Sequence, residues 1–114
     1  MSAQPVLVIH GGTGWRSDRA RLLRFRRSLR RICDASYDSL RGYSALDAVV
    51  FAVQQLEDDP LFNAGTGSTL QADGRVRMSA SVMDGAALRF GAVLNLERVR
   101  NPVRVAQALL QEPD

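Results

Sequence analysis

The chain has 114 residues, the length of a single domain, and its hydrophobic content of 46% excludes a disordered protein. No apolar run approaches the roughly 20 residues that a membrane span needs, and the first residues lack the basic region of a signal peptide. The formal net charge is +3, and Cys33, the single cysteine, cannot form an internal disulfide, so we expect a cytoplasmic protein that has no membrane partner.

The basic residues are all arginines, and eight of the 15 lie between Arg16 and Arg31, where only Asp18 opposes them. Such a basic stripe can bind phosphates, so a nucleic-acid-binding module is one hypothesis. Only Trp15 and Phe25 lie nearby as aromatic residues for stacking on bases. We therefore favour a solvated helix face over a nucleic-acid interface.

The chain begins with a short β-branched run at residues 5–9, which predicts a buried strand. A glycine-rich turn follows at residues 10–14. Its His10, the only histidine, could be a base or a ligand, but a histidine bonded to the backbone is the favoured interpretation. Apolar residues at three- and four-residue spacing then predict a helix over residues 18–40, which keeps most arginines off its apolar face and stops near Gly42.

A second helix is predicted to begin at Ser44, because Asp47 completes an acidic variant of the capping box. It ends in the acidic run 57–59, followed by Pro60 and a glycine-containing loop at residues 61–67.

Strands are predicted at residues 68–71, 75–82 and 88–96, and the first two are joined through a turn that contains Asp-Gly. Asn101 and Pro102 predict the start of a last helix. The order of elements indicates an α+β fold whose strands would keep unpaired edges in a chain of this length.

Six blocks of this sequence, in the same order, resemble the plant-type L-asparaginase/isoaspartyl peptidase family of N-terminal nucleophile hydrolases. These blocks are Val8-Ile9-His10-Gly11-Gly12, Ser44-Ala45-Leu46-Asp47-Ala48-Val49, Leu56-Glu57-Asp58-Asp59-Pro60-Leu61-Phe62-Asn63-Ala64-Gly65, Val82-Met83-Asp84-Gly85, Gly91-Ala92-Val93 and Asn101-Pro102.

The resemblance implies that residues 1–114 are a single incomplete domain, the front α-subunit portion of a partial αββα sandwich that lacks the β-subunit half. In the family, a precursor cleaves itself before a threonine, which then attacks L-asparagine or β-aspartyl dipeptides. The resemblance places that threonine beyond residue 114, so we expect no catalytic residue here and no activity of this chain alone. The implied partners are the β-subunit-like half and, once the two are joined, the small-molecule substrate, in a dimer of αβ units. The alternative is a non-catalytic remnant or an interaction module.

The residues that match the family's site have supporting roles. Asn63 matches an asparagine beside the nucleophile, and Gly11 and Gly12 match a turn packed close to it. No cofactor is implied except a structural sodium ion, held by the backbone carbonyls of Leu56, Glu57, Asp59, Phe62, Ala64 and Thr66. Asn63 as a plain turn residue remains the alternative.

Two threonines that follow glycine, Thr13 and Thr66, do not align with the family's cleavage site, so neither is expected to act as the nucleophile. The sequence departs from the family pattern at Ser79, where an aspartate is common, and at residues 95–97, where a more glycine-like stretch is usual.

Overall fold

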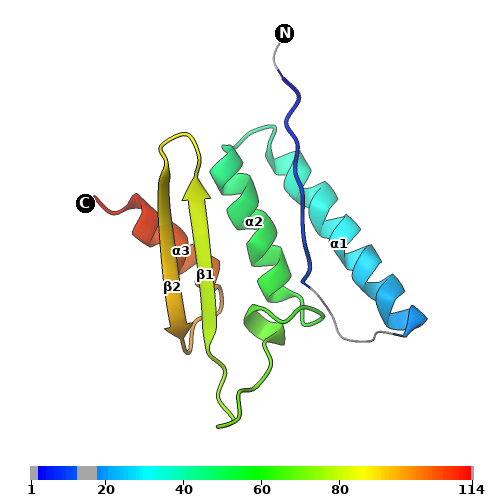
Figure 1. Cartoon of the computed structure of the whole chain (residues 1–114). Coiled ribbons are helices and arrows are strands. Elements are labelled where there is room, and N and C mark those ends of the chain that lie inside the picture. The colour runs from blue at the N-terminus through cyan, green and yellow to red at the C-terminus, as the bar shows by residue number, and fades with distance from the viewer. Residues whose placement is uncertain (1–2, 13–17, 114) are drawn as a thin grey trace.

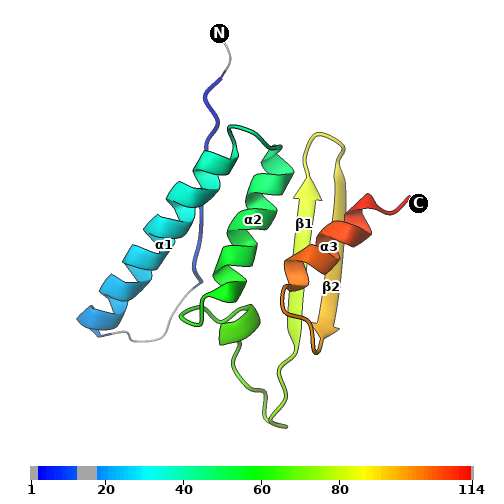
Figure 2. The ribbon, with the colours of Figure 1, turned by 180° about the vertical axis from the view of Figure 1, so that it is seen from behind.

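The computed structural model describes residues 3–12 and 18–113. Its elements follow one another as α1 (Arg19–Ser39), α2 (Ala45–Asp58), the short 3-10 helix η1 (Gly65–Gly67), β1 (Met78–Asp84), β2 (Arg89–Leu96) and α3 (Pro102–Gln111). The two long helices lie side by side, and α3 covers one face of the sheet that β1 and β2 form (Figures 1 and 2). This mixture of helices with a small two-stranded sheet agrees with the predicted α+β class.

Both long helices begin with a side-chain cap, and the sequence predicted the one at Ser44. Asp18 accepts a hydrogen bond from the Arg21 N–H at 2.7 Å, which begins α1. Ser44 accepts the Asp47 N–H at 3.1 Å and donates its hydroxyl to the Asp47 carboxylate at 2.7 Å. This confirms the acidic capping box, in which one side chain satisfies an orphan donor of the first turn.

The two-stranded sheet is antiparallel, with Val82 opposite Gly91 and Asp84 opposite Arg89. Its register shifts between Met78 and Ala80, where Asn95 takes a left-handed φ of 56°. Asparagine tolerates that conformation better than most residues, so it can replace a glycine-like position at the bulge. The strands predicted at residues 75–82 and 88–96 form, and the first of them is displaced to Met78–Asp84.

The main hydrophobic core lies between α2, the sheet and α3. Val50 of α2, Val82 of β1 and Val93 of β2 meet the apolar face of α3 there. The contact of α3 with β2 is so close that a Cβ atom added at Gly91 would lie 2.7 Å from the Leu110 nitrogen. Gly91 therefore allows α3 to pack directly against β2.

Two predicted strands do not form. Residues 5–9 run as extended chain beside the two long helices, and Val6 and Val8 are 84% and 85% exposed (Figures 1 and 2). A strand needs a neighbour for its backbone groups, and residues 5–9 pair with no strand in the described part of the chain. Residues 68–71 are also irregular, although the predicted turn after them is present, since the Gln71 N–H donates to the Arg75 carbonyl at 2.9 Å.

None of the helices in the described ranges combines the length and apolar character that crossing a bilayer requires.

Candidate functional site

The loop between α2 and β1 carries most of the predicted site residues, and Asp59 starts its reversal. This residue is the C-cap of α2 in an extended conformation. Its side chain accepts the Leu61 N–H at 3.0 Å and its carbonyl accepts the Phe62 N–H at 3.2 Å. The same carboxylate accepts the Ser28 hydroxyl of α1 and pairs with Arg31 at 3.4 Å. Asp59 therefore shapes the loop and ties it to α1.

Two glycines allow the loop to close tightly on itself. A Cβ atom at Gly65 would lie 2.6 Å from the Glu57 Cβ, and Gly65 also needs its left-handed φ of 50°. At Gly67 a Cβ atom would lie 2.7 Å from the Pro60 carbonyl oxygen and closer still to that of Phe62. Residues with side chains cannot reach this close approach of backbone to backbone.

Asn63 is exposed on this loop, and its side chain bonds to Thr69. The Asn63 Oδ1 accepts the Thr69 N–H at 2.9 Å and the Thr69 hydroxyl at 3.2 Å. The Nδ2 group of Asn63 has no hydrogen-bond partner among the described residues. One end of the amide therefore closes the loop, as a turn residue would, and the other end remains available as a donor.

A hollow of about 320 Å³ lies beside Asn63. Its lining is mostly polar and comes from the loop, from β1 and from the start of α3: Glu57, Asn63, Ala64, Gly65, Ser68, Thr69, Gln71, Arg77, Met78, Ser79 and Pro102. The Ser79 hydroxyl accepts the Asn95 N–H at 3.4 Å. Ser79, where the sequence departs from the family pattern, therefore bonds to the residue at the bulge of the sheet.

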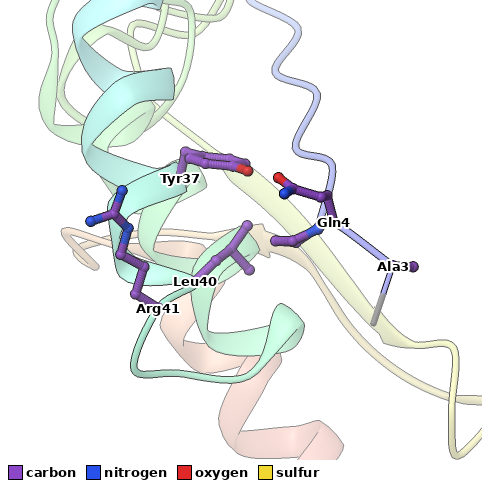
Figure 3. A pocket seen from close by; sticks show the side chains of 6 residues that line it. Ala3, Gln4, Tyr37, Leu40 and Arg41 are labelled. Carbon is purple, nitrogen blue, oxygen red and sulfur yellow. The ribbon is translucent and has the colours of Figure 1, made fainter. Parts of the chain in front are cut away.

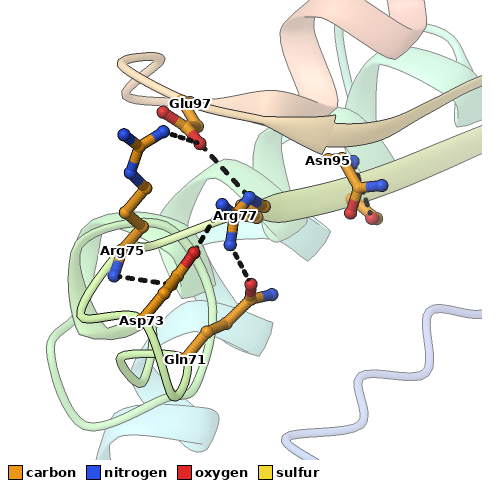
Figure 4. Close-up of polar contacts among 7 residues, drawn as sticks. Gln71, Asp73, Arg75, Arg77, Asn95 and Glu97 are labelled. Carbon is orange, nitrogen blue, oxygen red and sulfur yellow. Dashed lines mark hydrogen bonds and ion pairs between the residues drawn. The ribbon is translucent and has the colours of Figure 1, made fainter.

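Arg77 organises one wall of the hollow (Figure 4). Its guanidinium donates to the Gln71 side chain, pairs with Asp73 at 2.7 Å and pairs with Glu97 at 3.2 Å. The hydrogen bond from Arg77 holds the pKa of Asp73 below its usual range. These contacts connect the turn before β1 to the end of β2.

Glu57 also lines the hollow and is almost fully buried, at 3% exposure. One carboxylate oxygen accepts the Val103 N–H at 2.9 Å, and the other accepts the Asn101 side-chain amide at 3.1 Å. Burial raises the pKa of Glu57 above its usual value, because the loss of water penalises the carboxylate and the nearby charge of Asp58 adds to this, against the two bonds that favour the charged form. Asn101 thus occupies the predicted N-cap position, but its side chain bonds to Glu57 and Asp58 rather than capping α3.

The glycine-rich turn near the start of the chain reaches the same loop through Phe62. A Cβ atom at Gly11 would lie 2.8 Å from the Phe62 ring, and that ring meets Phe25 of α1 edge to face, with centroids 5.5 Å apart. His10 is exposed, and its Nδ1 accepts the Gly12 N–H at 3.0 Å, which confirms the interpretation as a backbone-bonded histidine.

Thr13 and Thr66 are the two threonines that are not expected to act as the nucleophile. Thr13 lies outside the described residues. Thr66 is exposed in η1, and its hydroxyl has no hydrogen-bond partner in the described part of the chain. A threonine hydroxyl without a neighbouring base is a poor nucleophile, so the surroundings of Thr66 favour no catalytic role.

The carbonyls predicted to hold sodium lie in the last turn of α2 and in the closed loop after it, where the Glu57 and Phe62 carbonyls crowd the two glycines. Those of Asp59 and Ala64 accept N–H groups of the loop, and a carbonyl oxygen keeps a second lone pair for a cation. Hard oxygen donors on a compact loop fit an alkali-metal ion.

A second hollow, of about 390 Å³, lies between the first described residues and the last turn of α1 (Figure 3). Tyr37, Leu40 and Arg41 line it on the helix side, and residues 3–5 line it on the other. No residue predicted for the site borders this hollow, so the hollow beside Asn63 is the candidate site.

Sequence reasoning missed the side-chain roles of Glu57, Thr69 and Arg77. The acidic run before Pro60 and the Asn-Pro pair at 101–102 were the available signals for Glu57. The hydrogen bond between Glu57 and Val103 joins residues that are 46 positions apart in the sequence. Neither Thr69 nor Arg77 stands in a pattern that indicates its contact.

Comparison with known proteins gives a consistent result. Residues 3–114 match the family described as Asparaginase. The isoaspartyl peptidase/L-asparaginase of Synechocystis sp. is 50% identical over 111 residues, which cover 96% of this chain and 34% of that protein. The plant-type L-asparaginase of Pyrococcus abyssi is 41% identical over 108 residues, which cover 95% of this chain and 35% of that protein. The Homo sapiens isoaspartyl peptidase/L-asparaginase is 42% identical over 109 residues, which also cover 95% of this chain and 35% of that protein.

The chain therefore spans about a third of the length of these curated relatives. The match covers nearly all of this chain, and it includes the loop around Asn63 and the turn at Gly11. The chain belongs to the plant-type L-asparaginase/isoaspartyl peptidase family.

Proposed function

We propose that this chain supplies the α-subunit-like part of a threonine-dependent amidohydrolase that acts on L-asparagine, on β-aspartyl (isoaspartyl) dipeptides, or on both. Family membership supports the class of reaction, because the relatives are named for these two activities. The observation that carries the position of the site is the Asn63 amide. Its Oδ1 is bonded to Thr69, while its Nδ2, which has no partner among the described residues, is a donor beside the polar hollow.

The chemistry divides between this chain and the remaining part of the enzyme. A threonine hydroxyl needs a base, and a freed α-amino group with a pKa of about 8 can take its proton on the same residue. That residue would come from the part that completes the chain. Asn63 would donate Nδ2–H toward the reacting oxygen, where a fixed donor stabilises developing negative charge. Gly11 and Gly12 would support the site through their backbone.

Three structural proposals accompany this function. The chain would form one side of an αββα sandwich that the β-subunit-like half completes, and two such αβ units would form a dimer. The carbonyls of Leu56, Glu57, Asp59, Phe62, Ala64 and Thr66 would hold a sodium ion, which would stiffen the loop under Asn63. The cytoplasm is the proposed location, since the half-buried Cys33 is a free thiol.

Complementation tests the proposal directly. The 114-residue chain is co-expressed with the part of the Synechocystis relative that follows the matched third. We expect the joined protein to release ammonia from asparagine or aspartate from a β-aspartyl dipeptide, and neither part alone to do so. Asn63→Ala should lower kcat on the order of a hundredfold, as the loss of one transition-state donor does. Gln111→Ala removes an exposed amide on α3 and is the matched control.

Two outcomes would contradict the proposal. A stable complex without turnover would favour the non-catalytic alternative, in which this chain is a remnant or an interaction module. Turnover by the chain alone that is lost in Thr13→Ala or Thr66→Ala would show that one of these threonines is the nucleophile.

A further inference from the structure

The first turn of α3 depends on a carboxylate that comes from another helix. Pro102, at the first helical position, has no N–H to donate, and the next N–H, that of Val103, is fully buried. Glu57 of α2 accepts this N–H at 2.9 Å, although the N-cap residue Asn101 would be the local candidate. An anionic acceptor suits this position, since the helix dipole places partial positive charge there.

The same residue forms the floor of the loop that carries Asn63. The backbone of Gly65 rests on the Cβ and carbonyl of Glu57 so closely that no side chain would fit between them. Glu57, Asn63, Gly65 and Thr69 all line the hollow beside β1. The backbone and the side chain of Glu57 therefore face two different elements, the loop and α3.

The hydrogen bonds of the Glu57 carboxylate therefore hold the Glu57 backbone in position. The bonds to Val103 and to Asn101 hold the end of α2 against α3, and the neighbouring Asp58 adds bonds to Asn101 at 3.0 Å and to Arg100 at 3.1 Å. If the carboxylate were lost, the last turn of α2 could shift, and the loop packed on it would shift as well.

We propose that the side chain of Glu57 is a positioning residue: it links the start of α3 to the loop and thereby holds the Asn63 amide in place for the reaction. This role is separate from the backbone carbonyl that the sodium proposal uses. Its catalytic consequence rests on the proposed function, whereas the link between Glu57 and the loop can be measured without any activity.

Amide hydrogen exchange of the 114-residue chain tests the link. The Val103 N–H reports the cap of α3, and the Thr69 N–H reports the loop, because Asn63 is its acceptor. We expect Glu57→Ala to speed exchange at both amides by about tenfold or more, in keeping with local opening. Glu57→Gln keeps an oxygen acceptor for Val103 but turns an amide nitrogen toward the Asn101 amide, so exchange at both amides should be faster than in the wild type and slower than in Glu57→Ala. Glu112→Ala, which removes an exposed glutamate at the end of α3, is the control.

Faster exchange at Val103 with unchanged exchange at Thr69 would overturn the proposal, because Glu57 would then only cap α3. In the complemented enzyme, Glu57→Ala should lower kcat on the order of tenfold to a hundredfold and leave KM within about twofold, with partial rescue in Glu57→Gln. An unchanged kcat would also overturn it. If the wild-type complemented protein has no turnover, the proposed function fails and the Thr69 exchange alone decides whether Glu57 positions Asn63.

Discussion

At the scale of single residues, the loop that carries Asn63 depends on positions where only a hydrogen atom fits. Gly67 faces the carbonyls of Pro60 and Phe62, whereas Gly85, in the turn between the strands, faces open space. The two glycines look equivalent in the sequence. They differ because one lies under a folded loop and the other lies at an exposed turn.

We therefore expect Gly67→Ala to lower the free energy of unfolding by about 3 kcal/mol, the cost of forcing a methyl group into a closed backbone. Gly85→Ala should change it by less than about 0.5 kcal/mol. Urea denaturation of both variants measures the difference. Equal stability of the two would show that the loop adapts to a side chain at Gly67.

At the scale of elements, the arginine-rich helix α1 is tied to the fold on one side and exposed on the other. Arg31 pairs with Asp59, and Arg21 lies over the Phe25 ring with its guanidinium carbon 5.5 Å from the ring centroid. Arg26, Arg27 and Arg30 are exposed, as the sequence predicted, and pair with no acid among the described residues. This face is therefore a solvated cationic surface.

We expect this surface to bind duplex DNA or RNA only weakly and without sequence preference. Contacts to phosphates alone give dissociation constants of about 10⁻⁴–10⁻⁶ M at physiological salt and weaken as salt rises. Fluorescence anisotropy with Arg26→Gln/Arg30→Gln as the comparison measures this. Nanomolar, sequence-selective binding that persists at roughly 200 mM salt would instead identify α1 as a nucleic-acid-binding helix.

At the scale of the whole molecule, the described residues leave one face of the sheet uncovered. The chain measures 45 × 35 × 18 Å, and α3 packs against only one face of β1 and β2 (Figure 2). On the other face Phe90 and Leu94 are 73% and 76% exposed, and Met83 lies opposite Phe90. Apolar surface of this kind favours association.

The 114-residue chain should therefore self-associate, and the complementing part should convert it into a defined complex. Phe90→Ser/Leu94→Ser should reduce the association of the isolated chain, because it removes apolar area from the uncovered face. Leu109→Ser changes a half-exposed leucine of α3 and is the control. Light scattering coupled to size exclusion measures the mass. A monomeric wild-type chain at high concentration would show that the uncovered face does not drive association.

The sequence by itself determined the elements whose signals are local. Apolar spacing predicted α1, the cap at Ser44 predicted the start of α2, and alternation predicted which side of β1 is buried. The family blocks also identified the loop around Asn63. These signals act within a few residues, where a side chain reaches the nearest turn or alternates across a strand.

Only the tertiary structure decided the partners of distant groups. Residues 5–9 have strand propensity, but no strand of the described residues lies next to them, so their backbone stays extended and unpaired with the sheet. Asn101 sits at an N-cap position, yet Glu57, 46 positions before Val103, provides the acceptor that α3 uses. The physical reason is the same in both cases: strand pairing and the burial of a carboxylate depend on which segments meet in space, and no local pattern encodes that meeting.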